Sequence, residues 1–262
     1  MVLVLQEQIK ELMRISKKNL EKFSKQIILK KIGIVGQKRI FMSKVLIIGA
    51  GGLGCPLALY LANSGVRNIG IADYDKIELS NLNRQIIYKP KDIGKLKANI
   101  IKREIKNIDK NIKVTIYKNK ISKNNVNNII KKFDIICDGT DNYQTRYLIN
   151  DACLKYKKKL ISAAIGKFDG QIFSFDFKNK VPCFRCFMPE IPSENNNCQT
   201  DGVLSTLAGI AGTIQANEVI KSILKVQNKL ASKVLVFNAL TLDFRKIKLI
   251  KNNNCIRECT KR

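Results

Sequence analysis

Apolar runs of four or five residues alternate with helical patterns over residues 44–164. The first run, 45–48, has no polar alternation, which is typical of a strand buried on both faces of a parallel sheet. Further strands are predicted at 68–72, 114–117, 134–137 and 160–164, and helices at 55–62, 94–107, 122–131 and 143–156. Strands that alternate with helices in this way predict an α/β fold, a Rossmann-like parallel sheet with flanking helices.

The first strand ends in the sequence G-x-G-x-x-G. In such a loop one glycine makes a tight turn, one lets the backbone approach a phosphate, and one lets the next helix pack closely on the strand. The loop glycines are Gly49, Gly51, Gly52 and Gly54, and Asp73 ends the second strand 19 residues after the loop, where a ribose-binding carboxylate is expected. Together these features predict a nucleotide site rather than a purely structural turn.

After residue 164 the pattern is no longer that of a parallel sheet. Residues 171–177 alternate apolar and polar positions, which favours an antiparallel strand. A loop over 179–202 carries three prolines and three cysteines, and it leads to a long helix over 203–224 and a closing hairpin of 233–237 and 242–250. The sequence therefore predicts an antiparallel extension in the C-terminal part of the chain.

The N-terminal residues are expected to form a helical arm. Apolar residues at helical spacing predict an amphipathic helix over 5–20, followed by a linker with Gly33 and Gly36 and a second helix over 37–42. We divide the chain into this arm at 1–43, a nucleotide-binding core at 44–164, and an antiparallel, cysteine-bearing region at 165–262. All three are expected to belong to one domain of 262 residues.

The chain is strongly basic, with 48 Lys and Arg against 21 Asp and Glu and a formal net charge of +27. Its lysines are spread along the chain and accompany many Asn and Ile residues, a composition that an AT-rich genome produces. A nucleic-acid partner is therefore not expected, and an acidic protein partner fits better. No apolar run approaches the ~18 residues of a membrane span, and the N-terminus lacks a signal-peptide pattern, so we expect a soluble, cytoplasmic protein.

Histidine is absent, so acid–base chemistry and metal binding fall to carboxylates, lysine and thiolates. Eight cysteines in such a chain suggest a metal site or a thiol nucleophile before disulfides. Cys183 and Cys186, with Cys255 and Cys259, make two pairs at the ligand spacing of a tetrahedral structural zinc site. The rival interpretation is a redox-active C-x-x-C pair, which would normally begin a helix, whereas Cys183 is predicted to lie in a loop after Pro182.

The other four cysteines fall into two groups. Cys55, Cys137 and Cys153 lie in apolar segments and are predicted to be core residues. Cys198 stands alone in a polar loop shortly before a predicted helix, where a lowered pKa would make its thiol a nucleophile. A non-essential loop cysteine is an equally open interpretation of this position.

Further motifs stand at Ser80-Asn81-Leu82-Asn83-Arg84-Gln85, at Gly94 to Lys97, at Thr140-Asp141-Asn142 and at Cys198 before Asp201-Gly202-Val203. Together with the glycine loop, Cys183-Phe184-Arg185-Cys186 and the C-terminal cysteine pair, they resemble the motifs of the ThiF/MoeB/HesA family, bacterial relatives of the ubiquitin-activating enzymes. The resemblance covers about residues 23–259 and implies an enzyme that uses ATP and Mg²⁺ to adenylate the C-terminal glycine of a small ubiquitin-like sulfur-carrier protein. The carrier would then receive sulfur for thiamine, molybdopterin or a related product.

The resemblance also assigns roles to individual residues. It implies that the ribose hydroxyls bind Asp73 and that the phosphates bind Asn81, Arg84, Gln85 and Lys97, with Mg²⁺ on Asp141 and Zn²⁺ on the four paired cysteines. Physical chemistry is compatible with these roles, because arginine can grip two phosphate oxygens and Mg²⁺ prefers carboxylate oxygen. Asp75 and Asp138 are weaker candidates for such roles, and a structural or supporting role is favoured for both.

One motif departs from the family pattern. Lys22 and Lys25 stand where the family usually has two arginines, and the second of these reaches from one subunit of a homodimer into the nucleotide site of its neighbour. Lys25 keeps the charge but not the bidentate fork, which puts the strength of that contact in question. An ordinary surface lysine is the open alternative. In some members of the family, the cysteine at the position of Cys198 bonds covalently to the carrier.

Three other functions compete with adenylation. A nicotinamide-dependent oxidoreductase would use the same glycine loop, but it does not explain Arg84, Lys97, Asp141 or the paired cysteines. A non-catalytic scaffold that binds the carrier is favoured by the two arginine replacements and opposed by the intact phosphate and magnesium positions. A role in tRNA modification is not supported by the basic charge alone. The chain ends at Arg262 without a rhodanese domain, so a separate sulfur donor is expected.

Overall fold

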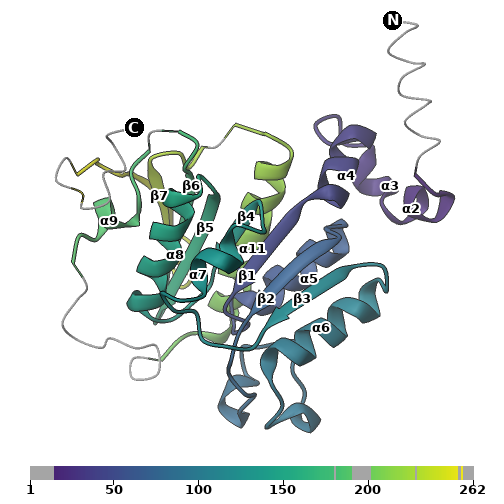
Figure 1. Ribbon diagram of the computed structural model, residues 1–262, viewed down its shortest axis with the longest axis horizontal. Coiled ribbons are helices and arrows are strands. Elements are labelled where there is room, and N and C mark those ends of the chain that lie inside the picture. Colours follow the sequence, from purple (N-terminus) through teal and green to yellow (C-terminus); the bar gives the residue numbers. More distant parts are fainter. Residues whose placement is uncertain (1–14, 180, 191–201, 228, 253–254, 256–262) are drawn as a thin grey trace, which may run out of the picture.

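The computed structural model describes residues 15–179, 181–190, 202–227, 229–252 and 255 (Figure 1). Among these residues, eight strands form one sheet in the order β3-β2-β1-β4-β5-β6-β7-β8. The parallel strands are β1 (Lys44–Ile48), β2 (Asn68–Ala72), β3 (Lys113–Tyr117), β4 (Ile135–Asp138) and β5 (Lys159–Gly166). The antiparallel strands are β6 (Asp169–Asp176), β7 (Lys233–Asn238) and β8 (Phe244–Lys248). The predicted parallel sheet and its antiparallel extension are both confirmed.

Helices cover both faces of this sheet (Figure 1). One face carries α5 (Gly54–Ser64), α6 (Lys97–Ile108) and α11 (Ser205–Ile223), and the other carries α7 (Val126–Ile130) and α8 (Tyr143–Lys155). The other described helices are α2 (Lys17–Lys22), α3 (Ser24–Ile27), α4 (Gly33–Met42), α9 (Phe184–Phe187) and two 3-10 turns, η1 (Leu79–Asn81) and η2 (Pro90–Asp92). No described helix combines the length and the apolar character needed to cross a membrane.

Strand β1 lies between two hydrophobic layers, one on each face of the sheet. Val45 and Ile47 pack into the layer that contains α5, α6 and α11, while Leu46 and Ile48 pack into the layer that contains α7 and α8. All four side chains are at most 2% exposed. The absence of polar alternation in this strand is therefore explained by burial on both faces.

The strand order reverses beside β1. The chain passes from β1 to β2 on one side, and β4 lies on the other side. Because the crossover helices then leave the two neighbouring strands in opposite directions, a crevice opens at the carboxyl ends of β1 and β4. The glycine loop and the turn after β4 both lie at this crevice.

The structure differs from the predicted arm in one element. The linker expected around Gly33 and Gly36 is part of α4, which begins at Gly33. A Cβ at Gly36 would come within 2.8 Å of Leu224 Cδ2, so this buried glycine allows α4 to pack closely against the end of α11. Packing between distant segments overrides the low helix propensity of glycine. Most of the helix predicted over 5–20 lies outside the described residues, which begin with Ile15.

Helix α7 is shorter than the predicted helix over 122–131. The Ser122 N–H donates to Asn125 Oδ1 at 2.9 Å, and Asn125 Nδ2 donates to Lys120 O at 2.9 Å. Such local side-chain bonds offer the backbone an alternative to helical hydrogen bonds. The helix consequently begins after Asn125, at Val126.

Helix α11 packs on the glycine loop through Gly212. A Cβ there would lie 2.5 Å from Leu53 O and 2.6 Å from Pro56 Cγ, whereas a Cβ at Gly209 on the same helix would meet nothing within 4 Å. We expect Gly212→Ala to lower the free energy of unfolding by ~1–3 kcal/mol through overpacking. Gly209→Ala, the matched control, should raise it by up to ~1 kcal/mol through helix propensity. Urea denaturation measures both values, and equal effects would contradict this packing.

Candidate nucleotide site and thiol cluster

A cavity of about 450 Å³ lies at the carboxyl ends of β1, β2, β4 and β5. Gly54 and Lys25 do not line it, but the other predicted nucleotide residues do. The structure therefore brings most of the predicted nucleotide residues together in one place. Those that line the cavity are Gly49, Gly51, Gly52, Asp73, Asn81, Arg84, Gln85, Lys97 and Asp141.

The glycine loop presents bare backbone to this cavity. The N–H groups of Gly51, Gly52 and Leu53 have no acceptor among the described residues, and they precede the first turn of α5. A Cβ at Gly51 would have a single neighbouring atom within 4 Å, so the space in front of it is open. Free N–H groups at the positive end of a helix are a ready site for phosphate. Gly54 has a packing role instead, because a Cβ there would overlap the Gly49 carbonyl oxygen.

Asp73 is held in place by two backbone donors. Its side chain is buried, Oδ2 accepts from the Ala50 N–H at 2.6 Å, and Oδ1 accepts from the Asp75 N–H at 2.8 Å. Burial raises the pKa of Asp73, while the Ala50 N–H and the charge of Lys97 oppose that rise. The carboxylate is thus anchored at the end of β2 and lines the cavity, where ribose hydroxyls can donate to it.

Lys97 is the first residue of α6, and several contacts fix the turn before it. Its Nζ donates to Asp75 Oδ2 at 3.1 Å and its N–H donates to Asp75 O at 2.9 Å. Asp92 is fully buried and accepts from two guanidinium nitrogens of Arg103, both at 3.0 Å, and from Lys95 Nζ at 3.2 Å. Arg103 holds the pKa of Asp92 well below its usual range. Sequence reasoning missed the Asp92–Arg103 pair, because nothing local links two residues 11 positions apart.

Arg84 and Gln85 follow the turn η1, and each has a polar group that is not fully paired by the described residues. Arg84 Nη1 donates to Ser80 O at 2.9 Å and to Asn83 Oδ1 at 3.1 Å, and no carboxylate of the described residues pairs with it. Gln85 is 4% exposed, and its Oε1 has no donor among the described residues. A buried acceptor without a donor is costly. A nucleotide, with phosphate charge and hydroxyl donors, fits both groups.

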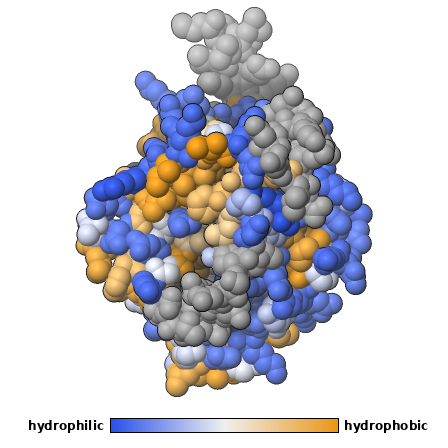
Figure 2. All heavy atoms as spheres, turned by 90° about the vertical axis from the view of Figure 1, so that its left-hand side faces the viewer, coloured by the Kyte–Doolittle hydropathy of each residue, from blue (hydrophilic) through white to orange (hydrophobic). Residues whose placement is uncertain are grey.

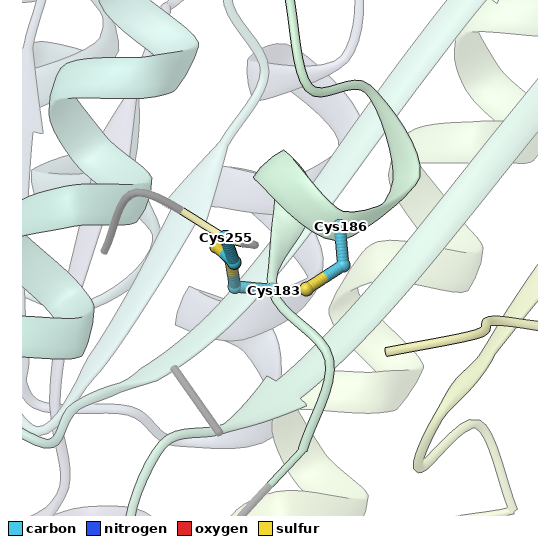
Figure 3. Close-up of side chains that lie close together, drawn as sticks. All are labelled: Cys183, Cys186 and Cys255. Carbon is cyan, nitrogen blue, oxygen red and sulfur yellow. The ribbon is translucent and has the colours of Figure 1, made fainter. Parts of the chain in front are cut away.

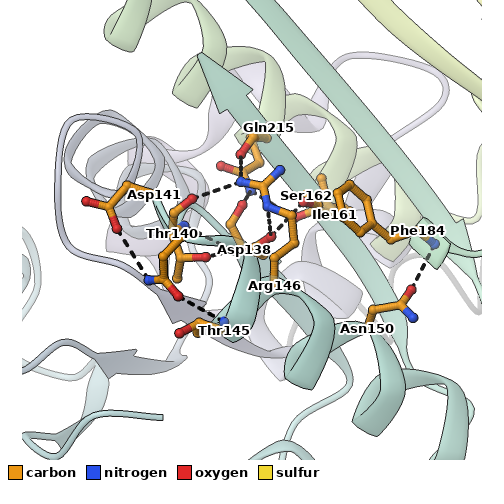
Figure 4. A network of polar contacts seen from close by, with 12 residues as sticks. Asp138, Thr140, Asp141, Thr145, Arg146, Asn150, Ile161, Ser162, Phe184 and Gln215 are labelled. Atoms are coloured by element: carbon orange, nitrogen blue, oxygen red, sulfur yellow. Dashed lines mark hydrogen bonds and ion pairs between the residues drawn. The ribbon is translucent and has the colours of Figure 1, made fainter. Parts of the chain in front are cut away.

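Asp141 stands in the turn after β4, and a buried network holds the residue before it (Figure 4). Thr140 donates its N–H and its Oγ1 to Asp138 Oδ1, at 3.0 and 2.6 Å, and Arg146 Nη2 donates to Thr140 O at 2.8 Å. Ser162 Oγ donates to Asp138 Oδ2 at 2.7 Å. The network fixes the backbone beside Asp141, while the Asp141 side chain stays exposed at the cavity. Asp138, expected in a structural role, has one here.

Arg146 and Gln215 complete this network, and sequence reasoning did not find them. Arg146 Nη2 also donates to Ala163 O at 2.9 Å, and Gln215 on α11 donates to Asp138 O at 2.9 Å and to Ile161 O at 2.8 Å (Figure 4). These bonds tie β4 and β5 to α8 and α11. No sequence signal marks them, because the partners are as many as 77 residues apart.

Three cysteines from two distant segments form a thiol cluster (Figure 3). The Sγ atoms of Cys183, Cys186 and Cys255 all lie within 4.8 Å of one another, and those of Cys183 and Cys255 are 3.7 Å apart. The fourth predicted ligand, Cys259, and the candidate nucleophile Cys198 lie outside the described residues. Three converging thiols suit a tetrahedral metal site with one further ligand.

Cys183 lies in a non-helical segment after Pro182, as predicted, but a short helix begins directly after it, at Phe184. Cys183 is the N-cap of α9, so the C-x-x-C pair does begin a short helix. Asn150 Oδ1 accepts from the Phe184 N–H at 2.9 Å, and Arg185 pairs with Asp151 through bonds of 2.8 and 2.9 Å. These contacts with α8 hold α9 in place. The helix start no longer argues against a redox pair, but the third thiol favours a metal.

The remaining described cysteines are core residues, as predicted. Cys55, Cys137 and Cys153 are fully buried. Burial raises the pKa of Cys55 to about 12, and it raises the pKa values of Cys137 and Cys153 well above the usual range. These thiols therefore stay protonated and are poor nucleophiles.

Lys25 does not line the cavity of its own chain. It is an exposed residue of α3, and its neighbour Gln26 donates to Ser64 O at 3.2 Å, at the far end of α5. The 11 residues of α5 place that end ~16 Å from the glycine loop. The other lysine of this motif, Lys22, pairs with Asp109, with its Nζ 4.0 Å from Asp109 Oδ2. A contact between Lys25 and a nucleotide would therefore need a second subunit.

A model of the ThiF family matches residues 23–258. The chain belongs to the ThiF family. This ThiF-family chain is 44% identical over 232 residues to a probable molybdopterin-synthase adenylyltransferase of Porphyra purpurea, covering 87% of this chain and 60% of the relative. It is 34% identical over 249 residues to a sulfur carrier protein adenylyltransferase of Thermus thermophilus, covering 93% of this chain and 92% of the relative. The chain spans 54–60% of the length of several curated relatives.

The fold of this ThiF-family chain also occurs in a solved structure. A crystal structure of E. coli MccB with ATP superposes with a TM-score of 0.74 at 21% identity, covering 93% of this chain and 82% of the other. At that identity the likeness shows a shared fold. The Rossmann-like arrangement predicted from the sequence is thereby confirmed.

The ThiF-family chain has a buried ion pair between Asp138 and Arg146, whose Nε lies 3.4 Å from the carboxylate. Because removal of one partner strands the other charge, we expect Asp138→Asn to lower the free energy of unfolding by about 3 kcal/mol or more. The control is Asp176→Asn, which alters a half-buried pair with Lys159 at 3.6 Å and should cost at most ~1 kcal/mol. Guanidinium denaturation compares them, and a cost for Asp138→Asn as small as the control's would contradict the network.

Proposed function

We propose that this chain catalyses the ATP-dependent adenylation of the C-terminal glycine of a small ubiquitin-like sulfur-carrier protein. The observation that carries this proposal is the single cavity in which the free N–H groups of the glycine loop, Arg84, Lys97 and Asp141 come together. The names of the relatives from Porphyra purpurea and Thermus thermophilus support the same activity. The first of these names also favours the molybdopterin branch over the thiamine branch.

The reaction asks little of acid–base chemistry. A carboxylate oxygen of the carrier attacks the α-phosphorus of ATP, a new O–P bond forms, and the bond to pyrophosphate breaks. No proton changes place in this step, which suits a chain without histidine. The protein must hold the reacting groups in line and offset the phosphate charge. Arg84, Lys97 and the glycine-loop N–H groups supply that charge and those donors.

The other side chains of the cavity fit supporting roles. Asp73 accepts from the ribose hydroxyls, and Asn81 and Gln85 donate their side-chain amide N–H groups to the phosphates. Lys97 exchanges its contact with Asp75 for a phosphate oxygen when ATP is present. Asp141 would hold Mg²⁺, because its exposed carboxylate is the ligand that Mg²⁺ prefers. When bound there, Mg²⁺ supplies further positive charge beside the phosphates.

The far end of the cavity is suited to a peptide tail without side chains. It is lined by apolar or small residues, among them Ala164, Ile165, Phe184, Met188 and Val203. Figure 2 shows the side of the molecule that carries α9, with an apolar area near the centre framed by hydrophilic side chains. Such an area, rimmed by polar residues, marks a protein interaction site. We therefore place the carrier on this face, with its Gly-Gly tail in the cavity.

Two further proposals concern assembly and location. In a homodimer, Lys25 of the partner subunit would add positive charge to the nucleotide site, which agrees with its exposure and its distance from the cavity of its own chain. Sulfur would come from a separate donor protein, with Cys198 taking part in transfer. A cytoplasmic location suits a chain in which Cys55, Cys137 and Cys153 are free thiols.

We also propose that Cys183, Cys186, Cys255 and Cys259 hold a structural Zn²⁺. Three of these thiols converge, and two of the three are buried, which gives the closed thiolate set of a structural site. Bound zinc would fasten the C-terminal segment to α9. A redox pair would use two thiols and would not explain why the third thiol lies beside them.

The competing functions leave parts of the site unexplained. An oxidoreductase that binds a nicotinamide nucleotide has no need for Asp141 in the same cavity as Arg84 and Lys97. A non-catalytic scaffold could use the apolar end of the cavity to bind the carrier. It has no need for the phosphate-binding groups that line the same cavity. Adenylation uses all of them.

Asp141→Ala should lower ATP–pyrophosphate exchange by ~10²-fold or more, because it removes the proposed magnesium ligand. The melting temperature should change little, since the Asp141 side chain is exposed. Asp134→Ala, at an exposed carboxylate beside the amino end of β4, is the matched control and should keep normal exchange. Normal exchange by Asp141→Ala would exclude the magnesium assignment.

The purified chain should contain about one Zn²⁺ per molecule, measured by plasma mass spectrometry. Cys186→Ser should lose most of it and melt at a lower temperature, because metal binding is coupled to folding. Cys153→Ala, a buried cysteine outside the cluster, should keep the metal. Zinc-free protein with a Cys183–Cys186 disulfide would favour the redox interpretation instead.

A further inference from the structure

Tyr88 is a buried tyrosine whose hydroxyl reaches the glycine loop. Its side chain is 5% exposed and packs in the hydrophobic layer under α5 and α6. Its Oη donates to Ala50 O at 2.6 Å, across 38 residues of sequence. None of the roles assigned above involves this residue.

Ala50 is held from both sides. Its N–H donates to Asp73 Oδ2 at 2.6 Å, and its C=O accepts from Tyr88 Oη at 2.6 Å and, more weakly, from Cys55 Sγ at 3.7 Å. The carbonyl therefore points into the core, away from the cavity. Because the C=O and N–H of a trans peptide point in opposite directions, the Gly51 N–H points the other way. That N–H has no acceptor among the described residues, and Gly51 lines the cavity.

Without the hydroxyl, the Ala50–Gly51 peptide would be freer to rotate. Glycine accepts either sign of φ at little cost, so a flip of this peptide is not blocked by sterics at Gly51. A flipped peptide would turn a carbonyl oxygen toward the cavity in place of an N–H. An oxygen there would repel a phosphate that the N–H attracts.

Tyr88 also connects the two chain segments that line the proposed phosphate site, the glycine loop and the segment that carries Arg84 and Gln85. Its N–H donates to Gln85 O at 3.0 Å, and it lies four residues after Arg84. One hydroxyl thus couples the segment that carries Arg84 and Gln85 to the glycine loop. If these two segments separated, the Arg84 guanidinium would move away from the N–H groups of the glycine loop.

We propose that Tyr88 is a positioning residue for phosphate binding, whose hydroxyl keeps the Ala50–Gly51 peptide turned so that its N–H faces the nucleotide. The proposal rests on the nucleotide site proposed above. Burial raises the pKa of Tyr88 far above its usual value, so the hydroxyl keeps its proton and remains a donor.

The test is Tyr88→Phe, which keeps the ring and removes only the hydroxyl. Dissociation constants for ATP and for adenosine are measured by calorimetry, well below the melting temperature of each variant. We expect ATP to bind about tenfold more weakly, the size of one lost hydrogen bond. Adenosine, which lacks phosphates, should bind as it does to the unaltered chain.

The matched control is Tyr147→Phe. Tyr147 is also buried, and its Oη donates to Met188 O at 2.6 Å, on the other side of the cavity. This variant should lose a similar amount of thermal stability and keep its affinity for ATP. If it weakened ATP binding as much as Tyr88→Phe, the role of Tyr88 would be general stability, and the proposal would be wrong.

Two other outcomes would overturn the proposal. Unchanged ATP affinity in Tyr88→Phe would show that the peptide keeps its orientation without the hydroxyl. An equal loss for ATP and adenosine would show damage to the whole site rather than to phosphate binding. If the unaltered chain failed to bind ATP at all, the nucleotide site itself would be wrong, and that result is distinct from both.

Discussion

Close approach of bare backbone is the constraint on which this site depends. A Cβ at Gly49 would lie 2.7 Å from Gly139 O, and a Cβ at Gly212 would lie 2.5 Å from Leu53 O. The glycine loop, the turn after β4 and helix α11 therefore meet with no side chain between them. Larger residues at these contacts would push the glycine loop away from the Asp141 turn, and both of these segments line the cavity.

A second feature is that the charged groups facing the cavity are supported by neighbouring ion pairs. Asp92 and Arg103 fix the turn before Lys97, and Asp138 with Arg146 fixes the turn that carries Asp141. Groups held in advance need little rearrangement when charge develops during a reaction, which makes their electrostatic contribution larger. In the proposed reaction, this preorganisation would let backbone N–H groups, arginine and lysine offset the phosphate charge without histidine.

The strands and the glycine loop could be predicted because their signals are local: apolar runs of fixed length and glycines at fixed spacing. Tyr88, Arg146 and Gln215 could not, because each donates to a backbone carbonyl that is distant in sequence, 38, 17 and 77 residues away. The start of α4 was missed for the same reason, since Gly36 is explained by its contact with Leu224. The residues proposed to contact the nucleotide could therefore be listed from motifs, whereas those that hold them in place required the fold.

The central claim is that the cavity joins ATP to the free carboxylate of a carrier protein. The most direct measurement incubates the chain with ATP, Mg²⁺ and a ubiquitin-like carrier ending in Gly-Gly, and follows the intact carrier by mass spectrometry. The account predicts an AMP adduct on the carrier with a free C-terminal carboxylate, and none on the same carrier with an amidated C-terminus. Absence of the adduct on the free carboxylate, in protein that binds both ATP and the carrier, would contradict it.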